Sequence, residues 1–327
     1  VAKEDVKVLK DRKLLERLET LLIDESSMIR ADIFDSIDLS LKINKKNKKP
    51  FGGVQIILFG DLFQLPPVVS SGDFEIVKKF YPGGEYFFNS KCFYKGKFII
   101  KELSKIFRQS DSDFIDLLNK FRLAKVTSED LDKINERLVK KNFDLPKETI
   151  ILSPRNKKVD EINTSKLNEI KSETYTYTAI IKDIFKENEH PVKKELSLKV
   201  GAQVMITKND VSEPKKWVNG TLATIVYLSK DQIKLKIKDQ VLNLPKSRWE
   251  KIDYRLIGKK INPTVIGTFV QYPLKLAWAA TIHKCQGQTF DQVAIDLDQG
   301  AFTHGQTYVA LSRAKTINGI HLMKEIR

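Results

Sequence analysis

The sequence predicts an α/β protein with two doubly wound, parallel-sheet domains and a small β-barrel inserted into the second domain. Three observations lead to this prediction. Apolar runs at 21–23, 54–59 and 149–152 have the length of buried strands and alternate with helical patterns, which is typical of parallel sheets covered by helices. Residues 233–237 instead alternate apolar and lysine side chains, which indicates a half-buried antiparallel strand. A length of 327 residues corresponds to about two domains.

The first domain is expected at residues 1–110. Its first element is predicted to be an amphipathic helix over 3–20, where leucines recur among charged residues. The lysine-rich segment 45–49 is predicted to be a loop, whose lysines either touch nucleic acid or keep the loop hydrated. Acidic residues follow both apolar runs of this domain, as Asp24-Glu25 and as Gly60-Asp61. Ligands bind at the carboxyl ends of parallel strands, so both positions are suited to chemistry.

The second domain is expected at 111–200 and 271–327, with the barrel at 201–270. Asp111 is a predicted helix cap, because apolar residues follow it at helical spacing. The run at 149–152 is followed by a predicted helix over 157–170, and mixed helix and strand patterns return from Leu274 onward. Within the barrel, Asn219-Gly220 is a hairpin signal.

The composition indicates a protein that binds polyanions. The formal net charge is +15, and a surplus of this size commonly marks nucleic-acid binding. No apolar run approaches the roughly 20 residues that span a bilayer, so no membrane partner is expected. Cys92 and Cys285 lie far apart and form neither a disulfide framework nor a metal cluster, which favours a reducing, intracellular compartment.

Five strings have the residue types needed for phosphate chemistry. Adjacent acids such as Asp24 and Glu25 can hold Mg²⁺ and orient a water molecule. In GDLFQLPPV at 60–68, the Gln64 amide can both donate and accept hydrogen bonds. Arg108 and Arg313 have the planar, permanently charged group that suits a phosphate clamp. The string TIHKCQGQT at 281–289 supplies hydroxyl, imidazole, ammonium and amide groups for phosphate contacts. Each string alone fits a turn or a surface side chain, and the order of all five is the stronger signal.

In this order the strings resemble superfamily-one DNA helicases, specifically the Pif (petite integration frequency) family and its RecD relatives. LLIDESSMI at 21–29, GDLFQLPPV at 60–68 and FRQSDSDFIDLLNKFR at 107–122 look like motifs II, III and IV. QYPLKLAWAATIHKCQGQTFDQVAIDL at 271–297 and GQTYVALSRAK at 305–315 look like motifs V and VI. GAQVMITKND at 201–210 with WVNG at 217–220 is similar to the opening of the family's inserted barrel. The resemblance implies two RecA-like domains with a barrel of the Src-homology type.

The resemblance also implies roles for individual residues. Asp24 would hold Mg²⁺, Glu25 would polarise the attacking water, and Gln64 would sense the γ-phosphate of ATP. Arg108 and Arg313 would be arginine fingers across the interdomain cleft. Two further residues near the nucleotide would be Gln286 and Gly287. The residues expected to face single-stranded DNA are Thr281, His283, Lys284, Phe63 and Trp217, although the two aromatic side chains could instead belong to the core.

The family activity would be ATP-driven, 5′-to-3′ movement on single-stranded DNA with strand separation. The expected partners are single-stranded DNA and forked or G-rich DNA, met by a monomer in DNA repair, recombination or telomere maintenance. The compartment would be the cytoplasm or nucleoid of a bacterium, or the nucleus or mitochondrion of a eukaryote.

The sequence departs from the family at one motif. No Gly-x-x-x-x-Gly-Lys-Ser/Thr string, the P-loop, occurs in it, since Pro82-Gly83-Gly84 lacks the following lysine and hydroxyl residue. We therefore expect residues 1–327 alone to hydrolyse ATP poorly or not at all. The chain is expected to be a truncated or partial helicase, or else a naturally short form. Two rival functions follow, a non-hydrolysing single-strand-binding remnant and a RecD-like subunit of a larger complex.

Overall fold

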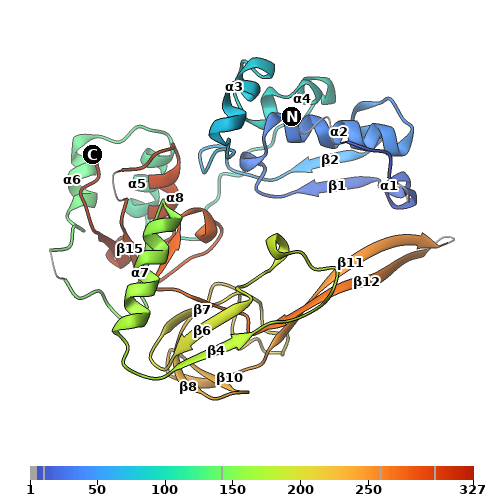
Figure 1. The fold of residues 1–327 in the computed structure, drawn as a ribbon. Coiled ribbons are helices and arrows are strands. Elements are labelled where there is room, and N and C mark those ends of the chain that lie inside the picture. The colour runs from blue at the N-terminus through green and yellow to red at the C-terminus, as the bar shows by residue number, and fades with distance from the viewer. Residues whose placement is uncertain (1–5, 10–11, 141–142, 258–259, 298–299) are drawn as a thin grey trace. The chain divides into compact units, whose positions relative to one another are not determined.

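The computed structural model describes residues 6–9, 12–140, 143–257, 260–297 and 300–327 (Figure 1). They divide into two compact units, each of which is described by itself. The first unit comprises Val1–Lys105, Tyr254–Thr264 and Thr303–Gly305. The second unit comprises Ile106–Asp253, Val265–Phe302 and Gln306–Arg327.

The first unit contains the two predicted strands with acidic ends. β1 (Thr20–Ile23) and β2 (Gln55–Leu58) pair in parallel, with Ile23 opposite Leu58. Both strand predictions are confirmed. The helices of this unit are α1 (Lys13–Arg17), η2 (Ser26–Met28), α2 (Ala31–Lys45), η3 (Pro50–Gly53), α3 (Ser71–Phe80), η4 (Phe87–Asn89) and α4 (Lys91–Gly96).

Helix α2 organises this unit through both apolar and acidic side chains. Its Phe34 is fully buried, with its ring centroid 5.2 Å from that of Phe51. Its buried Asp35 accepts hydrogen bonds from the Tyr81 hydroxyl and from the Cys92 backbone N–H, both at 2.9 Å. Buried carboxylates need such partners. Helix α2 was not predicted from the sequence, because Asp32, Asp35 and Asp38 interrupt its apolar positions.

The predicted helix over 3–20 was wrong for most of its described residues. Only α1 is helical, Val6–Leu9 is not, and Thr20 already belongs to β1. The ammonium group of Lys45 donates to the backbone oxygens of Leu15, Glu16 and Leu18 at 3.0, 2.7 and 2.9 Å. These bonds satisfy carbonyls at the end of α1, where the chain leaves the helix. Lys45 is the last residue of α2, so it does not belong to the predicted loop over 45–49. Residues 3–5 and 10–11 of the predicted helix lie outside the described residues.

The second unit contains a four-stranded parallel sheet in the order β14-β3-β15-β16. Its strands are β3 (Ile150–Ser153), β14 (Ala279–Thr281), β15 (Val293–Ile295) and β16 (Ile320–Leu322). Its helices are α5 (Ser112–Arg122), α6 (Ser128–Asn135), α7 (Asn156–Glu169), η6 (His283–Cys285), α8 (Gln306–Leu311) and η7 (Ile317–Gly319). The predicted strand and helix at 149–170 are confirmed. Asp111 caps α5 as predicted, accepting from the N–H groups of Asp113 and Phe114 at 3.0 and 3.2 Å.

The rest of the second unit is rich in antiparallel strands. The strands are β4 (Thr174–Thr178), β5 (Ile180–Asp183), β6 (Glu195–Lys199), β7 (Gln203–Ile206), β8 (Leu222–Leu228), β9 (Ile233–Ile237), β10 (Gln240–Leu244), β11 (Ser247–Ile257), β12 (Lys260–Gln271) and β13 (Leu274–Leu276). They form sheets in the orders β10-β9-β8-β7-β13, β11-β12-β5 and β4-β6. Residues Tyr254–Thr264, where β11 ends and β12 begins, are assigned to the first unit. The alternation in β9 is confirmed, with Ile233 and Leu235 buried and Lys236 exposed. The antiparallel strands β4, β5 and β6 lie between residues 174 and 199, where the sequence predicted no strand.

The hairpin prediction at Asn219-Gly220 needs correction. These residues form a turn, but it lies in the 15-residue connection 207–221 between β7 and β8. The two-residue hairpin is Lys238-Asp239, between β9 and β10. Among the described residues, no helix is both long and apolar enough to cross a membrane.

Candidate active site

In the first unit, the carboxyl ends of β1 and β2 hold the predicted acidic turns side by side. The Phe59 N–H donates to the Ile23 oxygen at 2.9 Å, and the Ser26 N–H donates to the Phe59 oxygen at 2.8 Å. These bonds continue the strand pairing around Asp24 and Glu25. The two residues therefore lie beside Gly60, as the parallel-strand argument predicted.

The close approach at this edge constrains two backbone positions. A Cβ atom on Gly60 would lie 2.6 Å from the Ser26 hydroxyl oxygen and 3.0 Å from its nitrogen, so only glycine fits there. Glu25 has a left-handed backbone, with φ of 52°. A non-glycine residue in this region is uncommon and is often found where function fixes the geometry.

Gln64 is held at the same edge by Asp61. The Gln64 backbone N–H donates to the Asp61 oxygen at 3.0 Å, and its Nε2 lies 3.3 Å from Asp61 Oδ2. The Phe63 N–H donates to Asp61 Oδ1 at 3.1 Å, and the Phe63 ring is 46% exposed. Phe63 is therefore not a core residue of the first unit. Gly305 belongs to the same unit, and a Cβ there would lie 2.1 Å from the Gln64 oxygen.

The acidic turn fits a hydrated Mg²⁺ ion. Asp24 is exposed, and its Oδ1 accepts the Glu25 N–H at 2.9 Å. That bond orients the carboxylate. Mg²⁺ keeps several water molecules and is commonly bound by one or two carboxylates together with substrate phosphates. A single exposed carboxylate at a strand end meets that requirement.

In the second unit, Gln109 fastens the segment that carries Arg108. Gln109 is buried, and its Nε2 donates to the backbone oxygens of Ser312 and Ala314 at 3.2 and 3.0 Å. These two carbonyls flank Arg313. Arg108 is exposed, with its Nη2 3.5 Å from the Gly287 oxygen. The strings that contain Arg108, Gly287 and Arg313 therefore meet in this unit, although they are far apart in the sequence.

Arg313 is the most buried of the charged residues predicted for the site, with 1% of its surface exposed. Its Nε donates to the Val309 oxygen at 2.9 Å, and its Nη2 to the Ser312 hydroxyl at 2.7 Å. Its Nη1 lies 3.1 Å from the Gln288 oxygen and 3.5 Å from the Cys285 oxygen. The guanidinium group thus ties α8 to the segment 285–288.

The segment Thr281–Thr289 begins at the carboxyl end of β14. Thr281 is buried, and its hydroxyl lies 3.4 Å from the Lys284 N–H, while the Lys284 side chain is exposed. Burial lowers the pKa of His283 below its ordinary value, which favours the neutral form of its imidazole. Gly287 has φ of +78° and open space around it, next to the half-buried Gln286.

Trp217 packs in a different way from Phe63. It is half-buried against the apolar core of the antiparallel strands. The turn that follows Trp217 lies close to the Thr281–Thr289 segment, because a Cβ atom on Gly220 would lie 3.1 Å from Cδ of Gln288. The structure therefore brings the WVNG string beside the Thr281–Thr289 segment.

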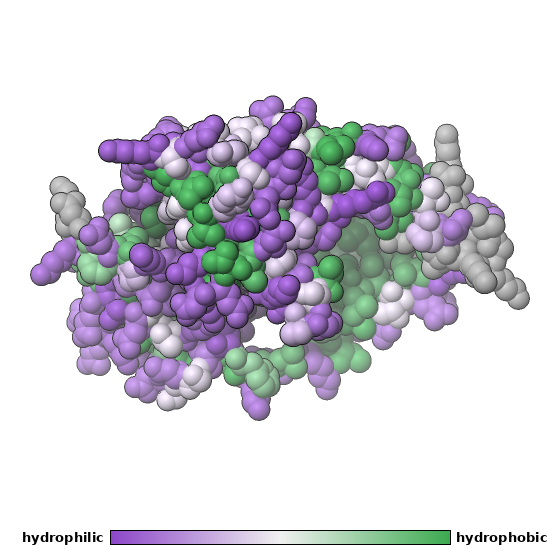
Figure 2. Space-filling model, turned by 90° about the horizontal axis from the view of Figure 1, so that it is seen from below, coloured by the Kyte–Doolittle hydropathy of each residue, from purple (hydrophilic) through white to green (hydrophobic). Residues whose placement is uncertain are grey.

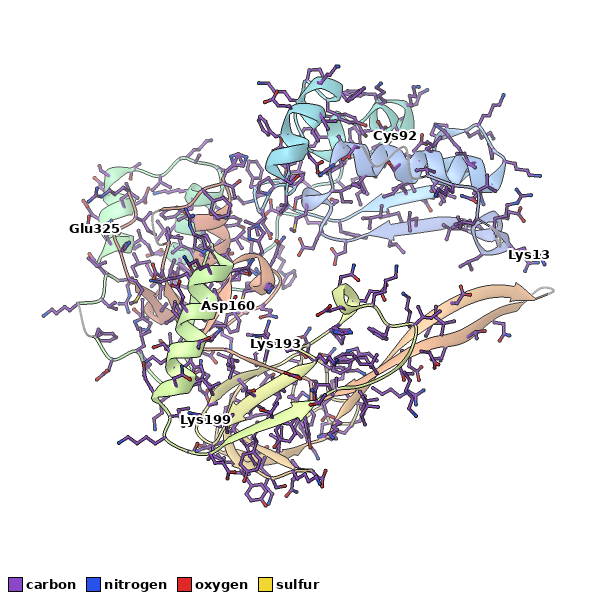
Figure 3. All side chains as sticks on the ribbon, viewed as in Figure 1. Lys13, Cys92, Asp160, Lys193, Lys199 and Glu325 are labelled. Atoms are coloured by element: carbon purple, nitrogen blue, oxygen red, sulfur yellow. The ribbon has the colours of Figure 1, made fainter. Side chains whose placement is uncertain are left out.

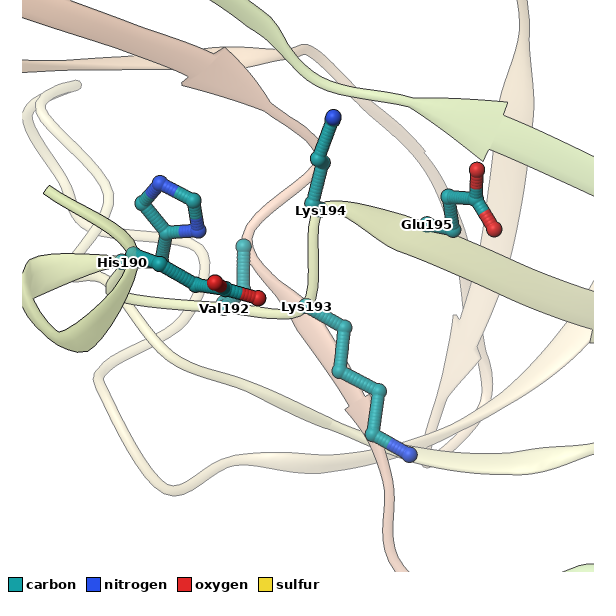
Figure 4. A pocket seen from close by; sticks show the side chains of 6 residues that line it. His190, Val192, Lys193, Lys194 and Glu195 are labelled. Carbon is teal, nitrogen blue, oxygen red and sulfur yellow. The ribbon is translucent and has the colours of Figure 1, made fainter. Parts of the chain in front are cut away.

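The site residues fall into one group in each unit. Side chains of both units are drawn in Figure 3, where Cys92 marks the first unit and Asp160 marks α7 of the second. A hollow of the second unit is lined by Glu187, His190, Val192, Lys193, Lys194 and Glu195 (Figure 4). None of the predicted site residues lines this hollow, and its two glutamates balance its two lysines.

Comparison with known proteins identifies the family. A family model described as "PIF1-like helicase" matches residues 4–132. The ATP-dependent DNA helicase Pif1 of Bdellovibrio bacteriovorus is 32% identical over 331 residues, which cover 96% of this chain and 69% of that protein. The chain belongs to the Pif1-like helicase family. A Pif1 helicase of Danio rerio is 33% identical, but the match covers 93% of this chain and only 46% of that protein.

Solved structures of Pif1 from Bacteroides share the fold. The complex with ADP-AlF4 has a TM-score of 0.89 at 40% identity, covering 98% of this chain and 74% of that chain. The complex with single-stranded DNA has a TM-score of 0.69 at 40% identity, covering 97% and 73%. Gln109, which bonds the carbonyls beside Arg313, and Gly305, which closely approaches Gln64, were not among the residues predicted for the site. Both stand inside quoted motifs, but a sequence does not show which carbonyls a side chain meets.

Proposed function

We propose that this protein is an ATP-driven DNA helicase that moves 5′-to-3′ on single-stranded DNA and separates duplex strands. The parallel sheets belong to two RecA-like domains, and the antiparallel strands to an inserted barrel of the Src-homology type. The observation that carries the proposal is the juxtaposition of Asp24, Glu25 and Gln64 at neighbouring strand ends, maintained by backbone bonds between Ser26 and Phe59.

The hydrolytic roles follow from this placement. Asp24 would hold Mg²⁺, and the ion would supply positive charge to neutralise the phosphate. Glu25 orients and deprotonates the attacking water, and its fixed left-handed backbone aims the side chain. Gln64 reads the γ-phosphate with an amide that Asp61 holds by a hydrogen bond.

The arginines stabilise charge as the γ-phosphate leaves. Arg108 is exposed, so it can act as a finger without losing buried hydrogen bonds. Arg313 would exchange part of its bonding to the 285–288 segment for phosphate contacts, which links phosphate binding to the position of Gln286 and Gly287. Both of those residues would then lie near the nucleotide.

Single-stranded DNA is proposed to run along Thr281, His283 and Lys284. Lys284 supplies a mobile positive charge to the backbone, and binding should therefore weaken as salt rises. Phe63 is exposed enough to stack on a base. Trp217 is half-buried in a core, so it is proposed to shape this surface. The Bacteroides relative has been solved bound to single-stranded DNA, and two coordinating Pif1 helicases have been studied at forked duplex DNA. These two structures support single-stranded and forked DNA as substrates. G-rich DNA and action as a monomer are further parts of the proposal.

Residues 1–327 alone are proposed to hydrolyse ATP poorly, because no P-loop string occurs among them. The rival function is a remnant that binds single strands without turnover. The test is DNA-stimulated ATP hydrolysis by the full-length protein and by its Glu25→Gln variant. We expect stimulation in the former and about a hundredfold or greater loss in the latter. Single-strand binding without stimulated hydrolysis in the full-length protein would select the remnant.

A further inference from the structure

The outer face of β8, β9 and β10 has the composition of a nucleic-acid-binding sheet. Ile225, Ile233, Leu235 and Leu244 belong to the core, so their neighbours along the three strands point outward. A bulge between Ile225 and Tyr227 shifts the register of β8 and brings Tyr227 opposite Lys234 on the same outward face. We call these outward residues the β8–β10 face: Thr224, Tyr227, Lys234, Lys236, Val241 and Asn243. The space-filling view shows hydrophilic and hydrophobic residues interleaved over the surface (Figure 2).

The strand register arranges the face in two rows. Lys236 lies opposite Thr224 on one side and Val241 on the other. Lys234 lies opposite Tyr227 and Asn243. Two residues along a strand span about 6.6 Å. The two lysines are therefore spaced for successive phosphates of an extended strand.

An aromatic ring lies beside these lysines. Tyr227 is 45% exposed, and Lys234 Nζ lies 5.3 Å from its ring centroid. Val241 is 57% exposed on the neighbouring strand. Single exposed apolar side chains are common on protein surfaces, so the informative feature is an exposed ring beside a lysine that has a second lysine two residues along the same strand. Aromatic rings interleaved with cations on a sheet are the pattern by which proteins bind single-stranded nucleic acid.

The charge around the face is positive. Segment 226–246 contains Lys230, Lys234, Lys236, Lys238 and Lys246 against Asp231 and Asp239, so five positive and two negative charges give +3. Both aspartates lie in the connections between strands. A third acidic residue, Glu173, lies beside Tyr175, which is itself a neighbour of Tyr227 on the face. Within the described part of the chain, no salt bridge occupies Lys234 or Lys236.

We propose that the β8–β10 face binds a second stretch of single-stranded DNA, separate from the stretch held by the Thr281–Thr289 segment. Lys234 and Lys236 contact successive phosphates, and a base stacks on Tyr227. The proposal rests on the proposed function only in taking DNA as the ligand. In an unwinding enzyme this face would hold DNA that lies outside the proposed path along Thr281, His283 and Lys284.

The test measures binding of fluorescein-labelled oligothymidylate by fluorescence anisotropy, without ATP. All variants carry Lys284→Glu, which weakens DNA binding along the proposed path of Thr281, His283 and Lys284. Adding Lys234→Glu and Lys236→Glu should lower affinity at least tenfold. The slope of log K against log salt should fall by about 1.4, because each single-strand phosphate contact contributes about 0.7. The matched control reverses two other exposed lysines of the same unit, Lys182 and Lys193, and should change affinity far less.

A second arm isolates the base contact. Tyr227→Ala should weaken oligothymidylate binding about tenfold and leave binding of an abasic strand with the same number of phosphates unchanged. Equal losses in the test and control lysine variants would overturn the proposal. So would polyglutamate that competes as well as DNA, since the face would then be a general polyanion surface. Failure of unwinding leaves these binding results unaffected, so the two proposals fail separately.

Discussion

The two groups of candidate site residues are held by different means. The Asp24 and Glu25 side chains stand on a turn whose geometry comes from backbone bonds between β1, β2 and Ser26. Arg313 and Gln109 are instead buried, and their own side chains make the bonds that hold neighbouring backbone. Substitutions in the first group should therefore change chemistry alone. Substitutions in the second group should change stability as well.

The largest expected effect concerns Asp24. Asp24→Asn keeps an oxygen that can accept the Glu25 N–H but removes the charge that holds Mg²⁺. We expect about a hundredfold or greater loss of ATP turnover in the full-length protein, with the urea unfolding midpoint unchanged. A large drop in that midpoint would show that the acidic turn also depends on its side chains for structure.

Arg313→Ala should unfold the protein more easily as well as slow turnover. It removes a buried guanidinium and leaves several backbone oxygens without their donor. We expect a loss of about 3 kcal/mol in the free energy of unfolding, measured by urea denaturation of residues 1–327. Arg108→Ala, on an exposed side chain, is the matched control and should cost less than about 0.5 kcal/mol. Equal losses in the two variants would remove the distinction between the groups.

Gln109→Met should have an intermediate effect. The substitution keeps the side-chain length but deletes the donor to the Ser312 and Ala314 oxygens. We expect a loss of about 2 kcal/mol and a fall in ATP turnover through displacement of Arg108 and Arg313. Gln109→Glu would place a buried carboxylate beside two carbonyl oxygens and should cost more stability than Gln109→Met. A variant with full stability would show that these bonds do not hold the segment.

The smallest effect concerns the connection 207–221, which carries Trp217. The Ser212 hydroxyl, followed by backbone N–H groups including that of Lys216, lowers the pKa of Asp210 to about 2. A carboxylate whose folded pKa is depressed stabilises the fold above its unfolded value of about 3.9, and that contribution is lost as pH falls toward 2. The protection of the Ser212 and Lys216 amides from hydrogen exchange, measured relative to the intrinsic exchange rate at each pH, should therefore fall between about pH 4 and pH 2.

The Asp210→Asn variant offers a comparison for that titration. It should exchange these two amides faster than the wild type at pH 7. The difference between the two proteins should shrink as the wild-type carboxylate is protonated. Identical exchange at pH 7 would contradict the role given to the Asp210 charge.

The sequence was sufficient for elements whose signal is local. Strands at 20–23 and 150–153, the Asp111 cap and the alternation in β9 follow from apolar runs, capping chemistry and the two-residue period. The adjacency of the acidic turns followed from a rule about parallel strands. What failed depended on distant partners. The Lys45 ammonium group bonds carbonyls at the end of α1, about 30 residues away in the sequence, and the Gln109 amide bonds carbonyls some 200 residues away.

The most direct test of the account is unwinding by the full-length protein on duplexes with a 5′ tail or a 3′ tail, in the presence of ATP and Mg²⁺. The account predicts strand separation on the 5′-tailed duplex alone, and none in a Glu25→Gln variant that still binds the tail. Unwinding only from 3′ tails, or unwinding that persists in the Glu25→Gln variant, would contradict the motor assigned to these residues.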